Sequence, residues 1–136
     1  TSVSRGLGDV YKRQGEGASG GALGIGLCDK MIMLENTWFS VISPEGCASI
    51  LWKDSSKAPE AAKSLKLTPK DLMEHNICNM IVYEPSGGAH RHFDATADIL
   101  KETILSEIKE LQNNLSSDFL ESRVSRYDKL GVFRED

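Results

Sequence analysis

The sequence lacks long apolar runs and is poor in aromatic residues and proline. Its longest uninterrupted apolar stretch, residues 22–28, contains two glycines and falls far short of the roughly 20 residues that cross a bilayer. Aromatic residues make up 7% of the 136 residues, and there are four prolines. The chain also opens without the basic and then apolar segment that is typical of a secretory signal. These absences argue against a membrane-spanning protein and against an exported one.

Cysteine is scarce as well. The three cysteines, Cys28, Cys47 and Cys78, are widely spaced and form no CxxC pair. This spacing excludes a zinc ribbon and a thioredoxin-like redox motif, which both need such pairs. Three thiols could serve as nucleophiles, but we expect these cysteines to act as small buried hydrophobic residues of a protein in a reducing compartment. The cysteine content therefore predicts a cytoplasmic protein.

There is no excess of basic residues. The chain has 16 Lys and Arg against 20 Asp and Glu, which gives a net charge of −4, and no basic cluster. General binding of nucleic acid is therefore not expected. The composition, with 40% apolar and 26% charged residues, is that of an ordinary globular chain. It supports one domain, or part of one, with a real core.

Residues 1–14 differ in character from the rest of the chain. They carry three basic residues against one acidic residue, whereas the remainder is acidic. Residues 4–14 match, at every position, the in-frame translation of a transposon-based sequencing adapter. Our hypothesis is that residues 1–14 are a non-native, adapter-derived segment, that the surviving native sequence starts near Gly15, and that the protein is truncated. The fold prediction leaves this segment out.

Beyond this segment, patterns typical of helices and strands alternate. Ser43 is a plausible helix N-cap, and Pro44 suits the first helical position. Thr68, Pro69 and Asp71 predict a capping box at the start of another helix. The patterns predict strands at 30–34, 38–42 and 80–83, a loop at 86–91, and helices at 44–52, 57–65, from 69 onward, 93–115 and from 116–118 to about 131. The expected class is α/β with much helix.

The clearest periodicity lies in the helix predicted at 93–115. Its apolar residues step by three and four, which indicates a single stripe: Phe93, Ala97, Leu100, Ile104, Ile108, Leu111 and Leu115. Its charged residues lie off the stripe and are expected to form a solvated face: Lys101, Glu102, Glu107, Lys109 and Glu110. A core or interface helix is the simplest interpretation.

Half of residues 15–26 are glycine, and Gly15, Gly17 and Gly20 form a literal GxGxxG. A dinucleotide-binding motif of this kind needs a preceding strand and an acidic residue about 20 positions on, where Glu35 is in range. Close packing of a helix explains the same glycines. A third interpretation is that glycines at a helix N-terminus leave backbone N–H groups free to face an anion or a developing oxyanion. The spacing leaves all three open.

Two further motifs carry side chains capable of chemistry. His90 and His92 form an HxH, but no nearby carboxylate or thiol completes a ligand set, so we expect no metal in this chain. The spacing is equally consistent with an Arg91 that binds a carboxylate or a phosphate and with an ordinary surface arginine. Ser43 lacks the Gly-x-Ser-x-Gly elbow of a nucleophile, which argues against a hydrolase triad.

Five blocks of the chain carry a resemblance: GEGASGGAL at 15–23, FSVISPEGCASILWKD at 39–54, KAPEAA at 57–62, EPSGGAHR at 84–91 and Arg126-Tyr127. Together they resemble one known family, the carboxyltransferase alpha subunit of bacterial acetyl-CoA carboxylase. They occur in the expected order and span nearly all of residues 15–136. The resemblance covers only the C-terminal part of the family's subunit.

The resemblance implies a crotonase-like fold of β-β-α turns, with residues 15–91 as the C-terminal part of that domain and residues 92–136 as a C-terminal helical region. It implies an enzyme subunit that transfers a carboxyl group from carboxybiotin to acetyl-CoA and so forms malonyl-CoA for fatty acid synthesis. The implied partners are a beta subunit in an α2β2 heterotetramer, the biotin carboxyl carrier protein and biotin carboxylase. In the family, acetyl-CoA is bound mainly by residues of the beta subunit.

The resemblance also assigns site residues. The backbone N–H groups of Gly20 and Gly21 would form an oxyanion hole for the ureido oxygen of biotin. Gly17 would permit close approach, and the remaining candidates would line or brace the site: Ser43, Pro44, Glu45, Gly46, Gly87, Gly88, His90 and Arg91. Ala18 stands where the family commonly has a further glycine.

Two alternatives stay open beside this interpretation. One is the carboxyltransferase of another biotin-dependent acyl-CoA carboxylase, such as one acting on propionyl-CoA. The other is a non-catalytic helical interaction module built on the long C-terminal helices. In all cases we expect residues 15–136 alone to be inactive and prone to aggregate.

Overall fold

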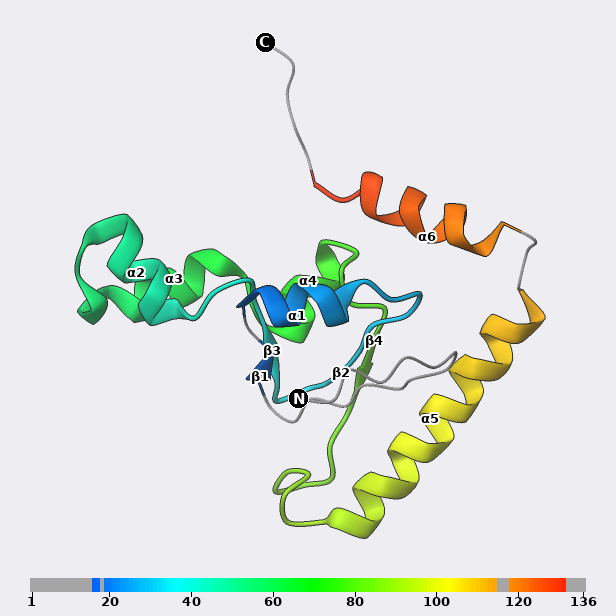
Figure 1. Cartoon of the computed structure of the whole chain (residues 1–136). Helices are drawn as coiled ribbons and strands as arrows, with labels where there is room; N and C mark the ends of the chain where they lie inside the picture. The colour runs from blue at the N-terminus through cyan, green and yellow to red at the C-terminus, as the bar shows by residue number, and fades with distance from the viewer. Residues whose placement is uncertain (1–15, 18, 115–117, 132–136) are drawn as a thin grey trace.

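The computed structural model describes residues 16–17, 19–114 and 118–131, in a mixed α/β architecture dominated by helices (Figure 1). The adapter-like segment, Ala18 and Leu115 lie outside the described residues, so the hypothesis about the N-terminal segment stays a prediction. The elements are β1 (Glu16–Gly17), α1 (Ser19–Gly26), β2 (Ile32–Leu34), β3 (Trp38–Phe39), α2 (Pro44–Trp52), the 3-10 turn η1 (Ser55–Lys57), α3 (Ala58–Leu65), α4 (Pro69–Glu74), β4 (Met80–Val82), α5 (Phe93–Asn113) and α6 (Phe119–Asp128).

The described strands form two parallel pairs. β1 pairs with β3, with Gly17 opposite Phe39, and β2 pairs with β4, with Met33 opposite Ile81. Helices intervene in the sequence between the partners of each pair, as parallel pairing requires. Since parallel strands end at the same edge, the chain leaves β1 toward α1 and β3 toward α2 on one side of their pair.

Local capping chemistry places two helices as the sequence predicts. The Ser43 hydroxyl accepts a hydrogen bond from the Gly46 N–H at 3.2 Å, and Pro44 is the first residue of α2. At α4, Thr68 and Asp71 form the predicted capping box, in which each side chain accepts a hydrogen bond from the other residue's backbone N–H. These bonds satisfy N–H groups that a helix start leaves without partners.

The strand predicted at 38–42 is shorter than expected. β3 ends at Phe39, and the chain bends through Ser40 to Ile42. The Ser40 hydroxyl accepts a hydrogen bond from the Ile42 N–H at 3.4 Å, so a local side-chain contact replaces a strand partner there. The bend aims the chain at the start of α2.

The core is small and lies between the β2–β4 pair and α4. Met33, Leu72 and Cys78 form its buried centre, and Met31 and Phe39 pack against it. The prediction of buried cysteines is confirmed for Cys78 only, since Cys28 and Cys47 are half-buried.

The orientation of α5 departs from the predicted stripe. Phe93, the first residue of the stripe, is 74% exposed, whereas the buried positions are Thr96 and Glu107. Glu107 was expected on the solvated face, and that expectation is wrong because Lys30 reaches its carboxylate at 2.9 Å. The helix is thus turned so that part of its apolar stripe faces outward.

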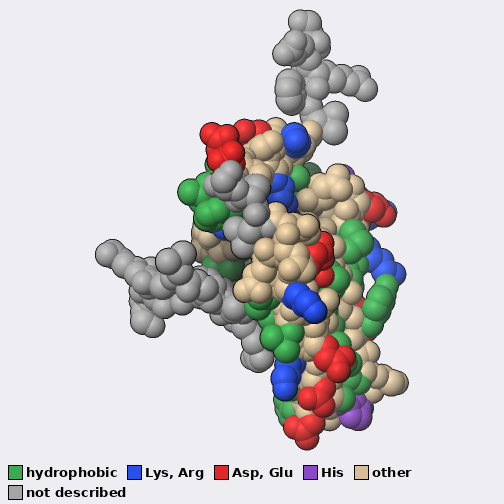
Figure 2. All heavy atoms as spheres, turned by 90° about the vertical axis from the view of Figure 1, so that its right-hand side faces the viewer, with side chains coloured by type: hydrophobic (Ala, Val, Ile, Leu, Met, Phe, Trp, Pro, Cys, Tyr) green, Lys and Arg blue, Asp and Glu red, His purple; other side chains and the backbone are tan. Residues whose placement is uncertain are grey.

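Apolar side chains reach the surface elsewhere too. Figure 2, seen from the side of α5, shows hydrophobic groups between the charged ones. On α2, Ile50 is 69% exposed and Leu51 is similarly open. None of the helices that the structure describes combines the length and apolar character needed to cross a membrane.

Candidate functional site

The described part of the glycine-rich segment contributes Gly17 to β1 and four glycines to α1, whose first turn is called the glycine turn below. Gly20 and Gly21 occupy the first turn of α1, and a Cβ atom added at either residue meets no described atom within 4 Å. At Gly26, by contrast, a Cβ would lie 3.2 Å from the ring of Phe39. Close packing within the described part of the chain therefore explains Gly26 but neither glycine of the first turn.

The open first turn has the electrostatics of an anion site. The N–H groups of the first residues of a helix have no intrahelical acceptor and carry the positive end of the helix dipole. The first turn of α1 contains no acidic residue that would neutralise it. Glycine also destabilises a helix by about 1 kcal/mol per residue relative to alanine, so four glycines in eight residues are costly for α1. Helix stability therefore does not account for Gly20 and Gly21, whereas packing against Phe39 accounts for Gly26.

The start of α2 lies at the same edge of the β1–β3 pair. Ser43 and Pro44 build the cap, and Glu45 is exposed in the first turn. Gly46 is required locally, because a Cβ there would lie 3.0 Å from Ile42. The structure thus brings the predicted Ser43–Gly46 segment to the side from which the glycine turn also emerges.

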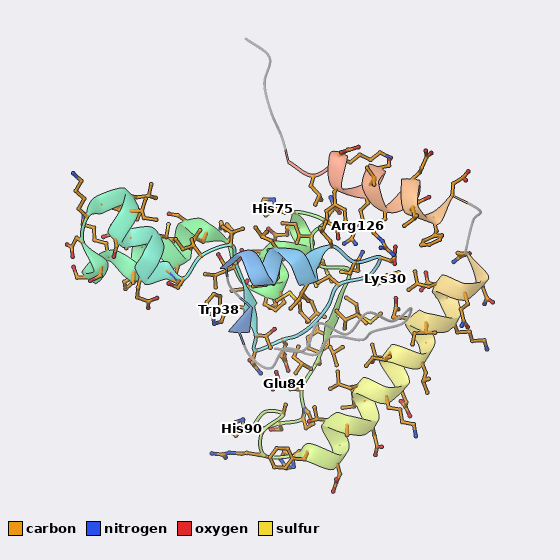
Figure 3. The ribbon with its side chains drawn as sticks, viewed as in Figure 1. Lys30, Trp38, His75, Glu84, His90 and Arg126 are labelled. Atoms are coloured by element: carbon orange, nitrogen blue, oxygen red, sulfur yellow. The ribbon has the colours of Figure 1, made fainter. Side chains whose placement is uncertain are left out.

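The third predicted group, in the loop after β4, is built on two glycines with positive φ. Gly87 has φ +97° and Gly88 has φ +93°, a region that side chains disfavour. A Cβ at Gly88 would lie 3.0 Å from the ring of His90. His90 and Arg91 are exposed. Figure 3 shows His90 beside the start of α5 and apart from α1, so this loop is not brought next to the glycine turn.

Glu84 organises this loop, a role that sequence reasoning did not assign. Its carboxylate accepts hydrogen bonds from the Ala89 N–H at 2.7 Å and from the Asn36 N–H at 3.3 Å. The bond from Ala89 is the main reason that the pKa of Glu84 lies below its ordinary value. Nothing in the local spacing signals this role, because Asn36 is 48 residues away in sequence.

The acidic residue considered for a dinucleotide motif has another partner. Glu35 accepts a hydrogen bond from the Glu84 N–H at 2.7 Å, where β2 and β4 end together. Its carboxylate therefore fastens a strand end. The first glycine of the motif, Gly15, lies outside the described residues. Among the residues described, no three His, Cys, Asp or Glu side chains gather as a potential metal site.

Helix α6 contacts the chain at the C-terminal end of α1. The Tyr127 hydroxyl accepts a hydrogen bond from the Cys28 N–H at 2.8 Å and lies within hydrogen-bond distance of the Gly26 carbonyl oxygen. Arg126 donates to the carbonyl oxygens of Cys28, at 2.8 Å, and Asp29, at 3.0 Å. Burial raises the pKa of Tyr127, so its hydroxyl keeps its proton.

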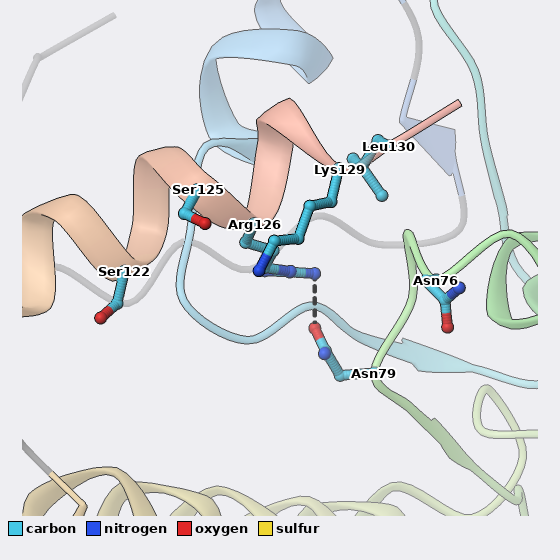
Figure 4. A pocket seen from close by; sticks show the side chains of 7 residues that line it. All are labelled: Asn76, Asn79, Ser122, Ser125, Arg126, Lys129 and Leu130. Atoms are coloured by element: carbon cyan, nitrogen blue, oxygen red, sulfur yellow. Dashed lines mark hydrogen bonds between the residues drawn. The ribbon is translucent and has the colours of Figure 1, made fainter. Parts of the chain in front are cut away.

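A hollow of about 600 Å³ lies beside this contact (Figure 4). Six of its seven lining residues have polar side chains, and Leu130 is the seventh: Asn76, Asn79, Ser122, Ser125, Arg126, Lys129 and Leu130. The guanidinium group of Arg126 is already occupied there, because it donates to the Ile77 carbonyl oxygen at 3.0 Å and to the Asn79 side-chain oxygen at 2.8 Å.

Comparison with known proteins confirms the resemblance. A family model described as acetyl co-enzyme A carboxylase carboxyltransferase-like matches residues 11–131. A relative from Thermus thermophilus is 47% identical over 121 residues, and one from Desulfitobacterium hafniense is 52% identical over 124 residues. Both are named acetyl-coenzyme A carboxylase carboxyl transferase subunit alpha.

The matches cover most of this chain but a minor part of the relatives. Each covers 89% of the chain, against 39% of the Thermus protein and 38% of the Desulfitobacterium protein. The chain thus spans about two fifths of the length of these curated relatives. By the extent of the family match, the chain belongs to the acetyl-CoA carboxylase carboxyltransferase family.

Proposed function

We propose that this chain is a segment of a carboxyltransferase alpha subunit that transfers a carboxyl group from carboxybiotin to acetyl-CoA and so forms malonyl-CoA. The family match and the names of the relatives support the proposal. The biotin is carried by the biotin carboxyl carrier protein, which biotin carboxylase reloads. The beta subunit completes an α2β2 assembly and provides most of the contacts to acetyl-CoA.

The observation that carries the proposal is the open glycine turn. Carboxybiotin, when bound, supplies the carboxyl group and leaves negative charge on its ureido oxygen. The free N–H groups of Gly20 and Gly21 stabilise that charge, as an oxyanion hole does. Apart from chain neighbours and the backbone of α1 itself, no described atom lies within 4 Å of the positions that a Cβ would occupy at these residues, so a ligand can approach the first turn from that side.

The other predicted site residues have supporting roles in this proposal. Gly17, paired with Phe39 in the β1–β3 pair, lies just before α1 and would permit close approach there. The α2 start, from Ser43 to Gly46, lines the same edge of that pair. Gly87, Gly88, His90 and Arg91 lie apart from the glycine turn, so we assign them to bracing or lining a more distant part of the site.

The same proposal extends to the fold, the domains and the location of the subunit. Two parallel strand pairs, with helices leaving one edge, support a crotonase-like arrangement of β-β-α turns. The loop before α5 supports a division into residues 15–91 and a helical region at 92–136. We propose that the subunit works in the cytoplasm.

Two competing functions make different predictions. A carboxyltransferase for another acyl-CoA would keep the glycine turn and differ in its substrate, and the names of the relatives favour acetyl-CoA. A non-catalytic module would use the long helices and would not need the open first turn of α1.

The test is Gly20→Val in the complete subunit, assembled with its beta subunit and supplied with a carboxylated carrier protein. We expect malonyl-CoA formation to fall by roughly a hundredfold or more while the assembly persists, because the Val side chain would keep the ureido oxygen away from the N–H donors. Gly24→Val is the matched control, because Gly24 is one turn further along α1 and is equally open. Full activity of Gly20→Val would falsify the proposal and favour the non-catalytic module.

A further inference from the structure

We propose that Arg126 and Tyr127 of α6 are positioning residues that hold α1 in the orientation its first-turn N–H groups need for catalysis. This inference rests on the proposed function of the glycine turn. Its basis is the set of hydrogen bonds that α6 makes with the exit of α1, at the end opposite to Gly20 and Gly21 (Figure 3).

The first step is that α1 cannot hold itself in place. It has eight residues, four of which are glycine, and no basic residue in its last turn. Isolated helices of this length are unstable in water even with better helix formers. Within α1 the buried positions are Ala22 and Gly26. The orientation of α1 therefore depends on contacts with other elements.

The second step is that α6 presents a matching face. Arg123, Arg126 and Tyr127 are three and four residues apart, a spacing that puts them on one side of a helix. Arg123 pairs with the Asp29 carboxylate through two of its nitrogens. The Arg126 guanidinium carbon lies 5.4 Å from the centre of the Tyr127 ring, so the two side chains support each other.

The third step is that these side chains meet the chain just where α1 ends. Tyr127 contacts the backbone of Gly26 and Cys28, and Arg126 donates to the carbonyl oxygens of Cys28 and Asp29. The Gly26 carbonyl oxygen belongs to the last turn of α1, where carbonyls lack intrahelical donors, and Arg126 binds the chain just beyond that end, where a cation complements the helix dipole. The hydroxyl and the guanidinium together fix the exit of α1.

The fourth step is that the same guanidinium reaches the strands. Arg126 donates to the Ile77 carbonyl oxygen and to the Asn79 side-chain oxygen, which also accepts a hydrogen bond from the Met31 N–H at 2.8 Å. The exit of α1 and the starts of β2 and β4 are thereby joined through one side chain. Arg126 fixes α1 relative to the β2–β4 pair, not merely to α6.

The consequence follows from the length of α1. Eight residues span about 12 Å, so a tilt at the exit displaces the N–H groups of Gly20 and Gly21. Misplacement by about 1 Å can slow catalysis by about a hundredfold. Arg126 and Tyr127 contact the chain at the end of α1 opposite to Gly20 and Gly21, and they touch no proposed substrate group. Their loss should therefore lower kcat and leave the KM for acetyl-CoA unchanged.

The experiment uses the complete subunit assembled with its beta subunit. Tyr127→Phe removes one hydroxyl, and Arg126→Lys keeps the charge while removing the planar fork. We expect each variant to lower kcat by about ten- to a hundredfold with an unchanged KM for acetyl-CoA. Amide hydrogen exchange should accelerate in residues 19–29 and stay unchanged in α3. Tyr83→Phe and Lys129→Gln, both at exposed positions, are the matched controls.

Several results would overturn the inference. Unchanged kcat in both variants would show that α6 does not position α1, and so would exchange that accelerates equally in α3, which indicates a general loss of stability. Gly20→Val separates this inference from the function on which it rests. An active Gly20→Val variant refutes the proposed function itself, whereas an inactive Gly20→Val beside fully active Tyr127→Phe and Arg126→Lys refutes only the positioning role.

Discussion

The Lys30 ammonium lies 2.9 Å from a carboxylate oxygen of Glu107 and 3.4 Å from one of Glu110. Glu107 keeps only 7% of its surface exposed, although it is a charged residue on a helix at the edge of the fold. Its hydrogen bond is the largest cause that raises the pKa of Lys30 above its ordinary value. Through this ion pair the long helix contacts the chain leading into β2, and α5 also contacts β4.

The first prediction concerns this ion pair. Lys30→Met leaves the nearly buried Glu107 without its cation and should lower the free energy of unfolding by about 1–2 kcal/mol. The double variant Lys30→Met/Glu107→Leu should recover part of that loss, because no unpaired charge remains. Denaturant unfolding of the complete subunit measures both. Glu102→Gln, at an exposed position of α5, should change little. A double variant less stable than Lys30→Met would contradict the prediction.

A second prediction separates the glycines of α1 by their surroundings. A Cβ at Gly24 meets no described atom within 4 Å, so Gly24→Ala should stabilise the subunit by about 0.5–1 kcal/mol through helix propensity. Gly26→Ala should instead destabilise it, because the new Cβ would lie 3.2 Å from the Phe39 ring. Thermal unfolding of the two variants, compared in parallel, tests this. Equal shifts of Tm would show that the difference in packing does not matter.

The sequence predicts those parts of the fold whose causes lie within a few residues. The cap at Ser43 and the capping box between Thr68 and Asp71 are of this kind, since each depends on side chains that reach N–H groups three residues away. The helices they start are placed correctly. Within the candidate site, the sequence pattern indicates the glycine-rich helix start and the Ser43 cap, whereas their catalytic roles come from the resemblance and stay predictions.

Other features depend on partners far away in the sequence. Tyr127 contacts Gly26 across 101 residues, and Glu84 contacts Asn36 across 48. No periodicity or spacing encodes such pairs. The apolar stripe of α5 predicts Glu107 on the solvated face, which is wrong for a related reason. The stripe shows which side of the helix is apolar, but Glu107 is buried because it pairs with Lys30, which lies far away in the sequence.

A third prediction uses the lowered pKa of Glu84. Because its folded-state pKa lies below the ordinary value of 4.5, its contribution to stability is present above that pH and is lost as the pH falls through the folded-state value. Glu84→Gln should therefore be less stable than the wild type near neutral pH, with a difference that shrinks below about pH 4. Thermal unfolding across this pH range measures the difference. Glu60→Gln, exposed on α3, is the control, and a constant difference for Glu84→Gln would count against the proposed cause.

A fourth prediction concerns Gly88 in the same loop. An alanine there would adopt φ +93° and place its Cβ 3.0 Å from the His90 ring, which adds a contact penalty to the backbone strain. Gly131 has nearly the same φ, +95°, but a Cβ there meets none of the described residues within 4 Å, so Gly131→Ala isolates the strain. Gly131→Ala should lose about 1 kcal/mol and Gly88→Ala clearly more. If the two variants lose equal stability, the His90 ring gives way without penalty.

The fifth prediction concerns residues 15–136 prepared without the rest of the subunit. Large apolar side chains lie open on several elements, among them Ile50 and Leu51 on α2 and Phe93 on α5. Exposed apolar surface of this kind promotes association. We therefore expect this segment to elute from a sizing column as aggregates and to bind a hydrophobic dye. A monodisperse sample with a cooperative melting transition would contradict the expectation.

A pair of matched variants tells apolar association from an effect of charge. Ile50→Lys/Leu51→Lys adds two positive charges and removes two exposed apolar side chains, whereas Ser49→Lys/Ser64→Lys adds the same charge at exposed polar positions. Both variants bring the net charge of residues 15–136 from −6 to −4, a change that by itself lowers solubility. If apolar contacts drive the association, only Ile50→Lys/Leu51→Lys should aggregate less than the unchanged segment. Equal aggregation of the two variants would instead assign the association to other surfaces.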